Sequence, residues 1–320
     1  EGTAVGKDAL LLNTTGEGNT ALGKSAMQDN TTGSYNAAGG LNALSNNTTG
    51  ADNTAFGVNA LLANTTAANN TAIGKSALDA NTEGHSNVAI GKDALGANIV
   101  GDELVAIGMD ALAVYTSTAA ASSGSTAVGF AAGKANVGVY AANNTFIGKQ
   151  AGTAVASAGN LICIGSGAAD TETVGNDSIY IGNYSNGGAS GSNSQNTALG
   201  HSTMAAASAG NHNTAIGHEA LNDHTSGTYN TCLGRQAGDK ITSGSNNVMI
   251  GYDAGSDGLT TITTGSNNIV IGNVSTAVAE VKVDWTVGSD QRDKTDIETL
   301  PDNAGLNFVN QMRPVTYVWD

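Results

Sequence analysis

A five-residue unit, Asn-Thr-Ala-Ile-Gly or a near variant, recurs along this chain with a spacing of 17 residues. Its closing glycine first stands at Gly6, keeps the spacing of 17 up to Gly108 and continues with small insertions to Gly272, which makes 16 copies in 320 residues. A repeat this short is too small for a helix pair or a propeller blade, but it matches one coil of a β-solenoid, whose coils stack as rungs. The spacing therefore predicts an all-β fold, a parallel β-solenoid of about 16 rungs over residues 1–275.

Positions in each copy are counted here from the repeat glycine. Position −1 is apolar in 15 of the 16 copies, position −3 is mostly β-branched, and position −2 is Ala in the first eight copies. Alternate residues of a strand share a face, so −1 and −3 point one way and −2 points the other. Both faces are apolar, so we expect both to be buried. One face fills the coil interior and the other needs a partner; because Ala permits close approach, we expect rods to pack side by side.

Other positions predict how the coil turns. Asn occupies −4 in 11 of 16 copies, which indicates a ladder of asparagines that hold turns rather than a ligand site. The repeat glycine is expected to take a positive φ or a tight corner. An Ala-Leu pair after it, such as Ala43-Leu44, predicts a second short strand in each coil. Cys163 and Cys232 share position −2 four rungs apart, roughly 19 Å, too far for a disulfide, so we expect two buried thiols.

Charge excludes several classes of function. The net charge is −15 and no basic stripe typical of nucleic-acid binding is present, so no nucleic-acid partner is expected. No apolar run approaches the roughly 20 residues of a membrane span, so no membrane insertion is expected.

His201 and His218 each follow a repeat glycine and should stack on adjacent rungs; with His212 and His224 we interpret them as solvated surface. No metal site and no cofactor are predicted. A row of lysines at the same position is interpreted as solvated charge: Lys7, Lys24, Lys75, Lys92 and Lys149.

The alternating Gly-Asn-Thr-Ala-Leu-Gly and Gly-Lys-Ser-Ala-Leu units resemble the head repeats of trimeric autotransporter adhesins, and equally the shafts of phage tail-fibre proteins. The resemblance covers roughly residues 1–275. It implies left-handed parallel β-rolls with three chains side by side, so we expect a homotrimeric rod.

From Asp284 the repeats cease and charged residues become frequent. Ser289-Asp290, Arg292, Lys294 and Ile297, with a closing Arg-Pro-Val-Thr-Tyr, resemble the start of the endosialidase-type intramolecular chaperone domain. That family trimerises phage fibres and often cuts itself off before the serine. The resemblance implies a cut between Gly288 and Ser289, with Ser289 as nucleophile, Lys294 as its general base and Asp290 as an orienting group. A serine hydroxyl needs such a base, and a lysine serves when burial lowers its pKa.

Only 32 residues of the longer family domain are present, so we expect no self-cleavage by this chain as given and no other enzyme activity. The expected domains are a solenoid at 1–275, a connector at 276–288 and the incomplete chaperone part, a short α/β segment, at 289–320.

The function predicted from these features is that of a structural and adhesive fibre in the tail of a phage virion. The expected partners are two further copies of the chain, a glycan or protein receptor on the host surface, and other tail proteins. Departures from the repeat, near 109–128 and 252–267, are the expected places for receptor contacts. A bacterial trimeric surface adhesin is the first alternative. A polysaccharide-degrading tailspike enzyme is the second, and it would need a cluster of carboxylates on one face.

Overall fold

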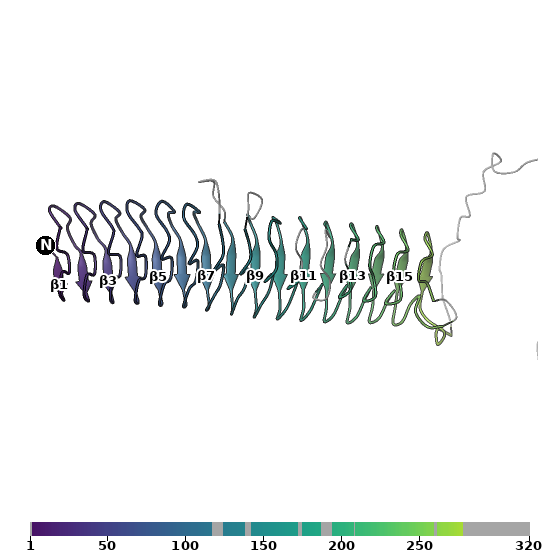
Figure 1. Ribbon diagram of the computed structural model, residues 1–320. Coiled ribbons are helices and arrows are strands. Elements are labelled where there is room, and N and C mark those ends of the chain that lie inside the picture. The colour runs from purple at the N-terminus through teal and green to yellow at the C-terminus, as the bar shows by residue number, and fades with distance from the viewer. Residues whose placement is uncertain are drawn as a thin grey trace, which may run out of the picture. The chain divides into compact units, whose positions relative to one another are not determined.

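The computed structural model describes residues 2–116, 124–137, 142–171, 175–186, 194–207, 209–258 and 261–277. These residues form a parallel β-solenoid with one three-residue strand in each coil (Figure 1). The strands lie in a single sheet in chain order, so the predicted fold class and period are confirmed. Their bounds are β1 (Thr3–Val5), β2 (Thr20–Leu22), β3 (Ala37–Gly39), β4 (Thr54–Phe56), β5 (Thr71–Ile73), β6 (Val88–Ile90), β7 (Val105–Ile107), β8 (Thr126–Val128), β9 (Thr145–Ile147), β10 (Ile162–Ile164), β11 (Ile179–Ile181), β12 (Thr197–Leu199), β13 (Thr214–Ile216), β14 (Thr231–Leu233), β15 (Val248–Ile250) and β16 (Ile269–Ile271).

Each strand pairs in register with the equivalent residues of the next copy. Ala38, for example, lies between Ala21 and Ala55. The longer spacings after Gly108 leave the register unchanged, because Ile107 still pairs with Val128. The extra residues are therefore accommodated outside the strands. The chain divides into two units, Glu1–Thr276 and Ala277–Asp320, and the second lies outside the described residues apart from residue 277. The domain boundaries given above remain predictions.

The prediction of a second strand in each coil was wrong. The Ala-Leu pair lies in a turn, in which Leu44 has a φ of 52° and is fully buried. The Leu44 N–H still donates to the Ala60 carbonyl of the next coil at 2.9 Å. Positive φ is uncommon for leucine. Here the coil has to bend around a side chain that points inward, and burial of that side chain compensates for the backbone strain.

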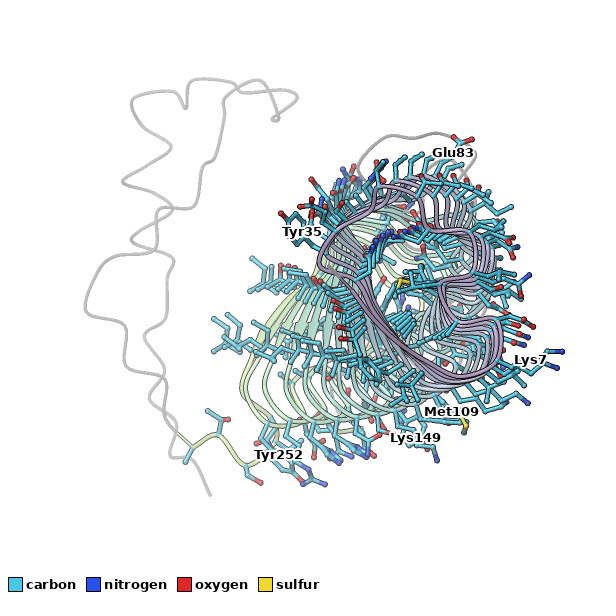
Figure 2. All side chains as sticks on the ribbon, turned by 90° about the vertical axis from the view of Figure 1, so that its left-hand side faces the viewer. Lys7, Tyr35, Glu83, Met109, Lys149 and Tyr252 are labelled. Carbon is cyan, nitrogen blue, oxygen red and sulfur yellow. The ribbon has the colours of Figure 1, made fainter. Side chains whose placement is uncertain are left out.

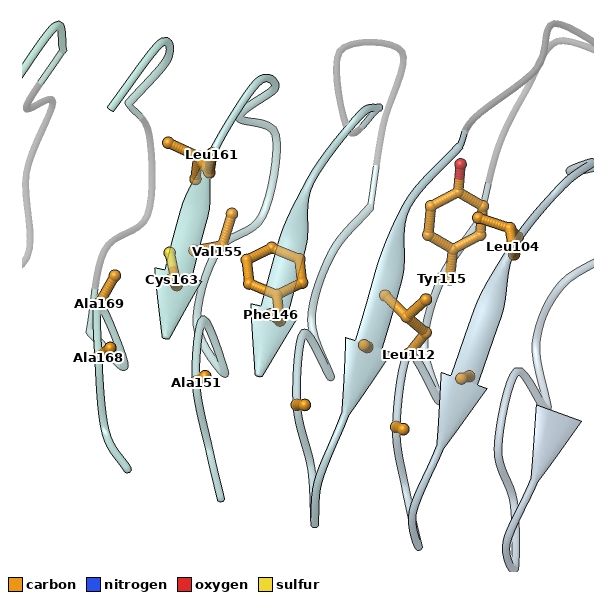
Figure 3. Packing of buried hydrophobic residues seen from close by; sticks show 14 of the residues in the cluster. Leu104, Leu112, Tyr115, Phe146, Ala151, Val155, Leu161, Cys163, Ala168 and Ala169 are labelled. Carbon is orange, nitrogen blue, oxygen red and sulfur yellow. The ribbon is translucent and has the colours of Figure 1, made fainter. Parts of the chain in front are cut away.

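The interior of the solenoid is lined by position −2. Ala21, Ala38 and Ala55 are at most 1% exposed, whereas the residues beside them on the same strands face outward. The alanines therefore fill the coil, and they are not the surface through which rods approach one another, as we had expected. The reason is size: in the first seven coils the opposite wall contributes a leucine or methionine, such as Leu44, which leaves room for only a methyl group on the strand side. Where that wall carries glycine instead, at Gly133 and Gly152, the strand side has room for a larger residue. In the middle of the rod Phe146 and Cys163 take this position (Figure 3).

Two buried asparagine ladders connect the rungs. At position −4, the predicted ladder is confirmed: the Asn36 N–H donates to Asn19 Oδ1 at 2.9 Å, and Asn36 Nδ2 donates to the Gly50 carbonyl at 2.8 Å. At position −10 a second ladder runs parallel to it, with Asn30 Nδ2 donating to Asn13 Oδ1 at 2.7 Å. Buried amides stabilise a fold only when their hydrogen bonds are made, and the asparagines of these two ladders bond the adjacent coil. Asn136, which is buried at the equivalent place after its repeat glycine, is an exception, because its amide has no hydrogen-bond partner.

The repeat glycine has the positive φ that the sequence predicts. Gly23 has a φ of 142°, and a Cβ there would lie 2.4 Å from the Gly40 carbonyl oxygen. No L-residue has access to that conformation at low cost, and the next rung leaves no space for a side chain. The corner after each strand therefore requires glycine, which explains why it is the least variable residue of the repeat.

Candidate interaction surfaces

The outer face of the sheet, made by positions −1 and −3 of every strand and called here the outer strand face, is exposed or half-buried along the rod. It carries an apolar row at −1 and a row at −3 in which nine of the sixteen residues are Thr. Ile73 is 41% exposed and Leu199 is 43% exposed although rungs stack on both sides of each. The sixteen rungs span roughly 70 Å and a three-residue strand is about 10 Å wide, so the strip measures roughly 700 Å². Monomeric proteins rarely expose an apolar patch above a few hundred Å². The apolar −1 row makes the outer strand face a candidate interaction surface.

A second surface follows the repeat glycine. The residues at position +1, called here the post-glycine row, are exposed in all rungs but the last, where the residue is half-buried. The row consists of Lys7, Lys24, Leu41, Val58, Lys75, Lys92, Met109, Phe130, Lys149, Ser166, Asn183, His201, His218, Arg235, Tyr252 and Asn273. Figure 2, a view along the rod, shows its labelled members Lys7, Met109, Lys149 and Tyr252 at one edge, with Tyr35 and Glu83 at the opposite edge.

Planar side chains of the post-glycine row stack on one another near its C-terminal end. The rings of His201 and His218 are 5.1 Å apart and within 8° of parallel, as predicted. The Arg235 guanidinium lies 5.3 Å from the centre of the Tyr252 ring, within the range of a cation–π contact. The sequence interpretation missed this second pair, although the common position after the glycine would have indicated it.

Charge is distributed unevenly around the coil. All eight Lys and Arg residues in the described part of the chain lie between the repeat glycine and position +6, and six of the eight lie in the post-glycine row. The row itself contains no acidic residue. Six carboxylates lie before the glycine with no Lys or Arg among the described residues there: Glu17, Asp52, Glu83, Asp102, Glu103 and Asp177. The rod thus has a basic row and an acidic edge.

Some of these charged side chains form ion pairs. Lys92 Nζ lies 2.6 Å from Asp93 Oδ2, and this hydrogen bond raises the pKa of Lys92. Lys134, which is outside the row, pairs with Asp110 at 3.0 Å. No carboxylate of the described residues lies within 4.0 Å of the side-chain nitrogen of Lys24, Lys75 or Lys149. Those three lysines present a charge that a ligand can use.

His224 departs from the expected solvated surface, because it is fully buried. It occupies position −10, where the N-terminal coils carry the inner asparagine ladder, and its Nε2 lies 2.7 Å from the Gly227 carbonyl. Nδ1 has no hydrogen-bond partner. Burial lowers the pKa of His224 and outweighs the hydrogen bond to Gly227. The buried asparagines in the same column of other coils were the signal that could have predicted this.

The cysteines are free and buried, as predicted. Burial raises the pKa of the Cys232 thiol to about 12, so at neutral pH it remains protonated and unreactive. Cys232 and Cys163 therefore act as small apolar side chains in the interior. Neither carries chemistry for a site.

Several predicted positions lie wholly or partly outside the described residues. Ser289, Asp290 and Lys294 are among residues 278–320, so their geometry, the proposed cut and the predicted α/β segment there stay predictions. The insertion expected near 109–128 is described except for 117–123. The one near 252–267 is described except for 259–260, and in it the Ile262 N–H donates to the Gly255 carbonyl at 2.8 Å.

The described residues offer little for other kinds of site. Within the described ranges no three or more His, Cys, Asp or Glu side chains are grouped so that they could hold a metal ion. In that part of the chain no helix has the length and apolar character that crossing a bilayer requires. A shallow pocket of about 300 Å³ at the first two rungs is lined by Gly2, Thr3, Gly18, Asn19 and Thr20, and so by no carboxylate.

No curated protein matches the chain. Residues 289–320 match the model of a family described as the chaperone of endosialidase. The match agrees with the resemblance seen in Ser289-Asp290 and the residues that follow. The chain therefore combines a parallel β-solenoid with a C-terminal segment similar to the chaperone of endosialidase, a combination that fits a phage tail fibre.

Proposed function

We propose that this chain is the rod of a phage tail fibre that attaches the virion to the host surface, in contact with other tail proteins. The observation that carries the proposal is the junction of a stiff repeat rod with a segment similar to the chaperone of endosialidase. The rod acts as a spacer, because each strand is hydrogen-bonded to the next from β1 to β16. A fibre of several chains also binds weak receptors with avidity, since one contact raises the effective concentration of the next.

The proposed assembly is a homotrimer in which the outer strand faces of three chains meet at a common axis. Three arguments support it: the continuous apolar −1 row within the roughly 700 Å² outer strand face of each chain, the similarity of the C-terminal segment to a trimerising family, and the absence of Lys and Arg from the strands. An apolar strip of constant width along a straight sheet suits a partner of the same length and shape. A second and third copy of the chain have both.

A matched pair of substitutions tests the trimer. Ile73 on the outer strand face and Val58 in the post-glycine row are both 41% exposed, so aspartate costs the isolated chain about the same at either position. We expect the wild-type chain and Val58→Asp to sediment as trimers, and Ile73→Asp to sediment as a dissociated or unfolded chain, with circular dichroism reporting the fold. A monomeric wild type, or equal behaviour of the two variants, would contradict the proposal.

We further propose that the longer parent protein releases its chaperone part by cleavage between Gly288 and Ser289. Ser289 would be the nucleophile, Lys294 its base and Asp290 the orienting residue, which is the arrangement that similarity to the family implies. Release after assembly would leave the trimer kinetically trapped, since the chains could no longer refold with help.

A further inference from the structure

The post-glycine row combines two kinds of side chain that a purely solubilising surface does not need together. Six of its sixteen members are Lys or Arg, whereas Lys and Arg make up only 12 of the 320 residues of the chain. Between the lysines stand Leu41, Val58, Met109 and Phe130, each between 40% and 44% exposed. Charge alone would keep the rod soluble, so the exposed apolar side chains among the cations indicate a ligand that offers both anionic and apolar contacts.

The geometry of the row suits a linear ligand. Its members repeat at rung spacing, so Lys7 and Tyr252 are 14 rungs and roughly 67 Å apart along a straight edge. His201 stacks on His218 and Arg235 lies over Tyr252, so side chains of adjacent rungs are ordered along the row. Glu219 Oε2 lies 3.4 Å from His218 Nδ1 and accepts a hydrogen bond from Gln236 Nε2 at 2.9 Å. The Glu219 carboxylate is therefore turned toward its neighbours. The result is a line of donors and apolar groups along the rod.

We propose that the post-glycine row binds an acidic polysaccharide that lies along the rod axis. A chain of uronic or other acidic sugars carries carboxylates for the unpaired Lys24, Lys75 and Lys149. It also carries apolar C–H faces for the leucine, valine, methionine, phenylalanine and tyrosine of the row. The inference deepens the proposed function, because it names the class of receptor and the surface that meets it, and it rests on that function for its biological setting.

The density of charge distinguishes this ligand from nucleic acid. Duplex DNA carries one charge per roughly 1.7 Å, whereas the row offers six cations over 14 rungs on a chain of net charge −15. A densely charged polymer would be repelled by the acidic edge and by the carboxylates at position +2. A polysaccharide with at most one carboxylate per sugar is less densely charged, so each cation of the row can meet one carboxylate while the other carboxylates stay in solvent. Screening over about 8 Å at physiological salt limits the repulsion from the rest of the rod.

The test uses the full 320-residue chain and sodium polygalacturonate as the probe, with dextran as an uncharged polymer, in isothermal titration calorimetry. The variant Lys75→Ser/Lys149→Ser removes two unpaired cations from the row. The matched control Lys134→Ser/Lys240→Ser removes the same charge from outside the row, where both lysines are engaged in ion pairs. We expect the row variant to bind polygalacturonate roughly fivefold more weakly and the control to stay within about twofold of the wild type.

A third variant, Phe130→Ser, tests the apolar contacts. We expect it to weaken binding about twofold while leaving the salt dependence of the affinity unchanged, since no charge is lost. Equal losses in the row variant and its control would overturn the proposal, because they would indicate only diffuse attraction. So would undetectable binding of polygalacturonate by the wild type, or equal binding of dextran.

Sedimentation of the same variants separates this proposal from the trimer. If Lys75→Ser/Lys149→Ser dissociates the assembly, the row is a contact between chains and the proposal is wrong. If the wild-type chain is monomeric but binds polygalacturonate through the row, the proposed trimer fails and the polysaccharide surface stands.

Discussion

The ring of Phe56 lies over Gly39, the residue at the same position of the preceding rung. A Cβ on Gly39 would be 2.5 Å from Phe56 Cδ1, so the ring occupies the space that a side chain would fill. The pair explains why Gly39 alone interrupts the apolar −1 column. The bulkiest residue of the outer strand face therefore lies beside a glycine that makes room for its ring, and the face does not become wider there.

We expect Gly39→Ile to destabilise the rod by about 1–3 kcal/mol in urea unfolding, because the added side chain displaces the Phe56 ring. The double variant Gly39→Ile/Phe56→Ile should recover most of that loss, since isoleucine in both rungs restores the pattern of the other coils. A double variant no more stable than Gly39→Ile would show that the loss arises elsewhere. Full stability of the single variant would show that the ring is free to move away.

The buried asparagine ladder should be sensitive to single truncations. Asn53 donates from Nδ2 to the Ala67 carbonyl at 2.9 Å, and its Oδ1 accepts the Asn70 N–H at 3.0 Å. Replacement by Ala leaves both groups buried without partners, so we expect Asn53→Ala to cost about 2–4 kcal/mol in the free energy of unfolding. Asn46→Ala, at an exposed position, is the control and should cost less than about 0.5 kcal/mol. Similar losses in both would contradict the ladder's role.

The stability of the rod should fall as the pH drops below about 6.5. Burial lowers the pKa of His224, so the folded chain keeps this side chain neutral at pH values where the unfolded chain, with an ordinary pKa of about 6.5, takes up a proton. The unfolded state therefore binds more protons, and the free energy of unfolding decreases as pH falls through that value. Urea midpoints measured between pH 8 and 5 should decline more steeply in the wild type than in His224→Asn.

Two half-buried carboxyls act in the opposite direction, at lower pH. Desolvation raises the pKa of Asp79 and of Asp170, so the folded chain binds protons there more readily than the unfolded chain. Their contribution to stability is present at pH values below the ordinary aspartate pKa and is lost as pH rises through the raised one. This contribution therefore differs from the loss of stability that begins as the pH falls below about 6.5. An identical pH profile in wild type and His224→Asn would exclude His224 as the cause.

Mass spectrometry of the full-length parent should find a break between Gly288 and Ser289. We expect Ser289→Ala to abolish it and Lys294→Ala to slow it strongly, because the hydroxyl needs a base. Ser275→Ala, changed outside the family match, is the control and should be cleaved like the wild type. A parent that stays intact after prolonged expression would sink the self-cleavage proposal.

Much of the rod was predictable because its period is strict. The spacing of 17 determines which residues pair, and so the Asn19–Asn36 bond and the His201–His218 stack could be anticipated from positions alone. The orientation of the strand could not, because both of its faces are apolar. Which face of the strand turns inward depends on the width of the coil, because Leu44 and its equivalents already occupy the opposite wall. The prediction for His224 was wrong because it considered only that the residue is a histidine. It did not consider that other coils carry buried asparagines at the same position.

The arrangement of the candidate functional residues in space is the part of the structure that the sequence predicts least. The predicted catalytic group is Ser289, Asp290 and Lys294, and it depends on similarity to a family rather than on a pattern within the repeat. The post-glycine row depends on side chains from many coils, and only stacking reveals it as continuous. A residue such as Arg235 looks isolated in the sequence, yet in the solenoid it is the neighbour of Tyr252.

The in-register pairing of every strand with the next has a consequence for how such a fibre can evolve. A deletion or duplication of one 17-residue copy joins two coils that already fit, since each presents the same backbone groups and the same glycine corner. The rod would change in reach by one rung, about 4.8 Å, while the outer strand face and the post-glycine row stay continuous. In the proposed homotrimer three chains encoded by one gene would change together, so length could be adjusted by recombination between copies without any new packing having to be found.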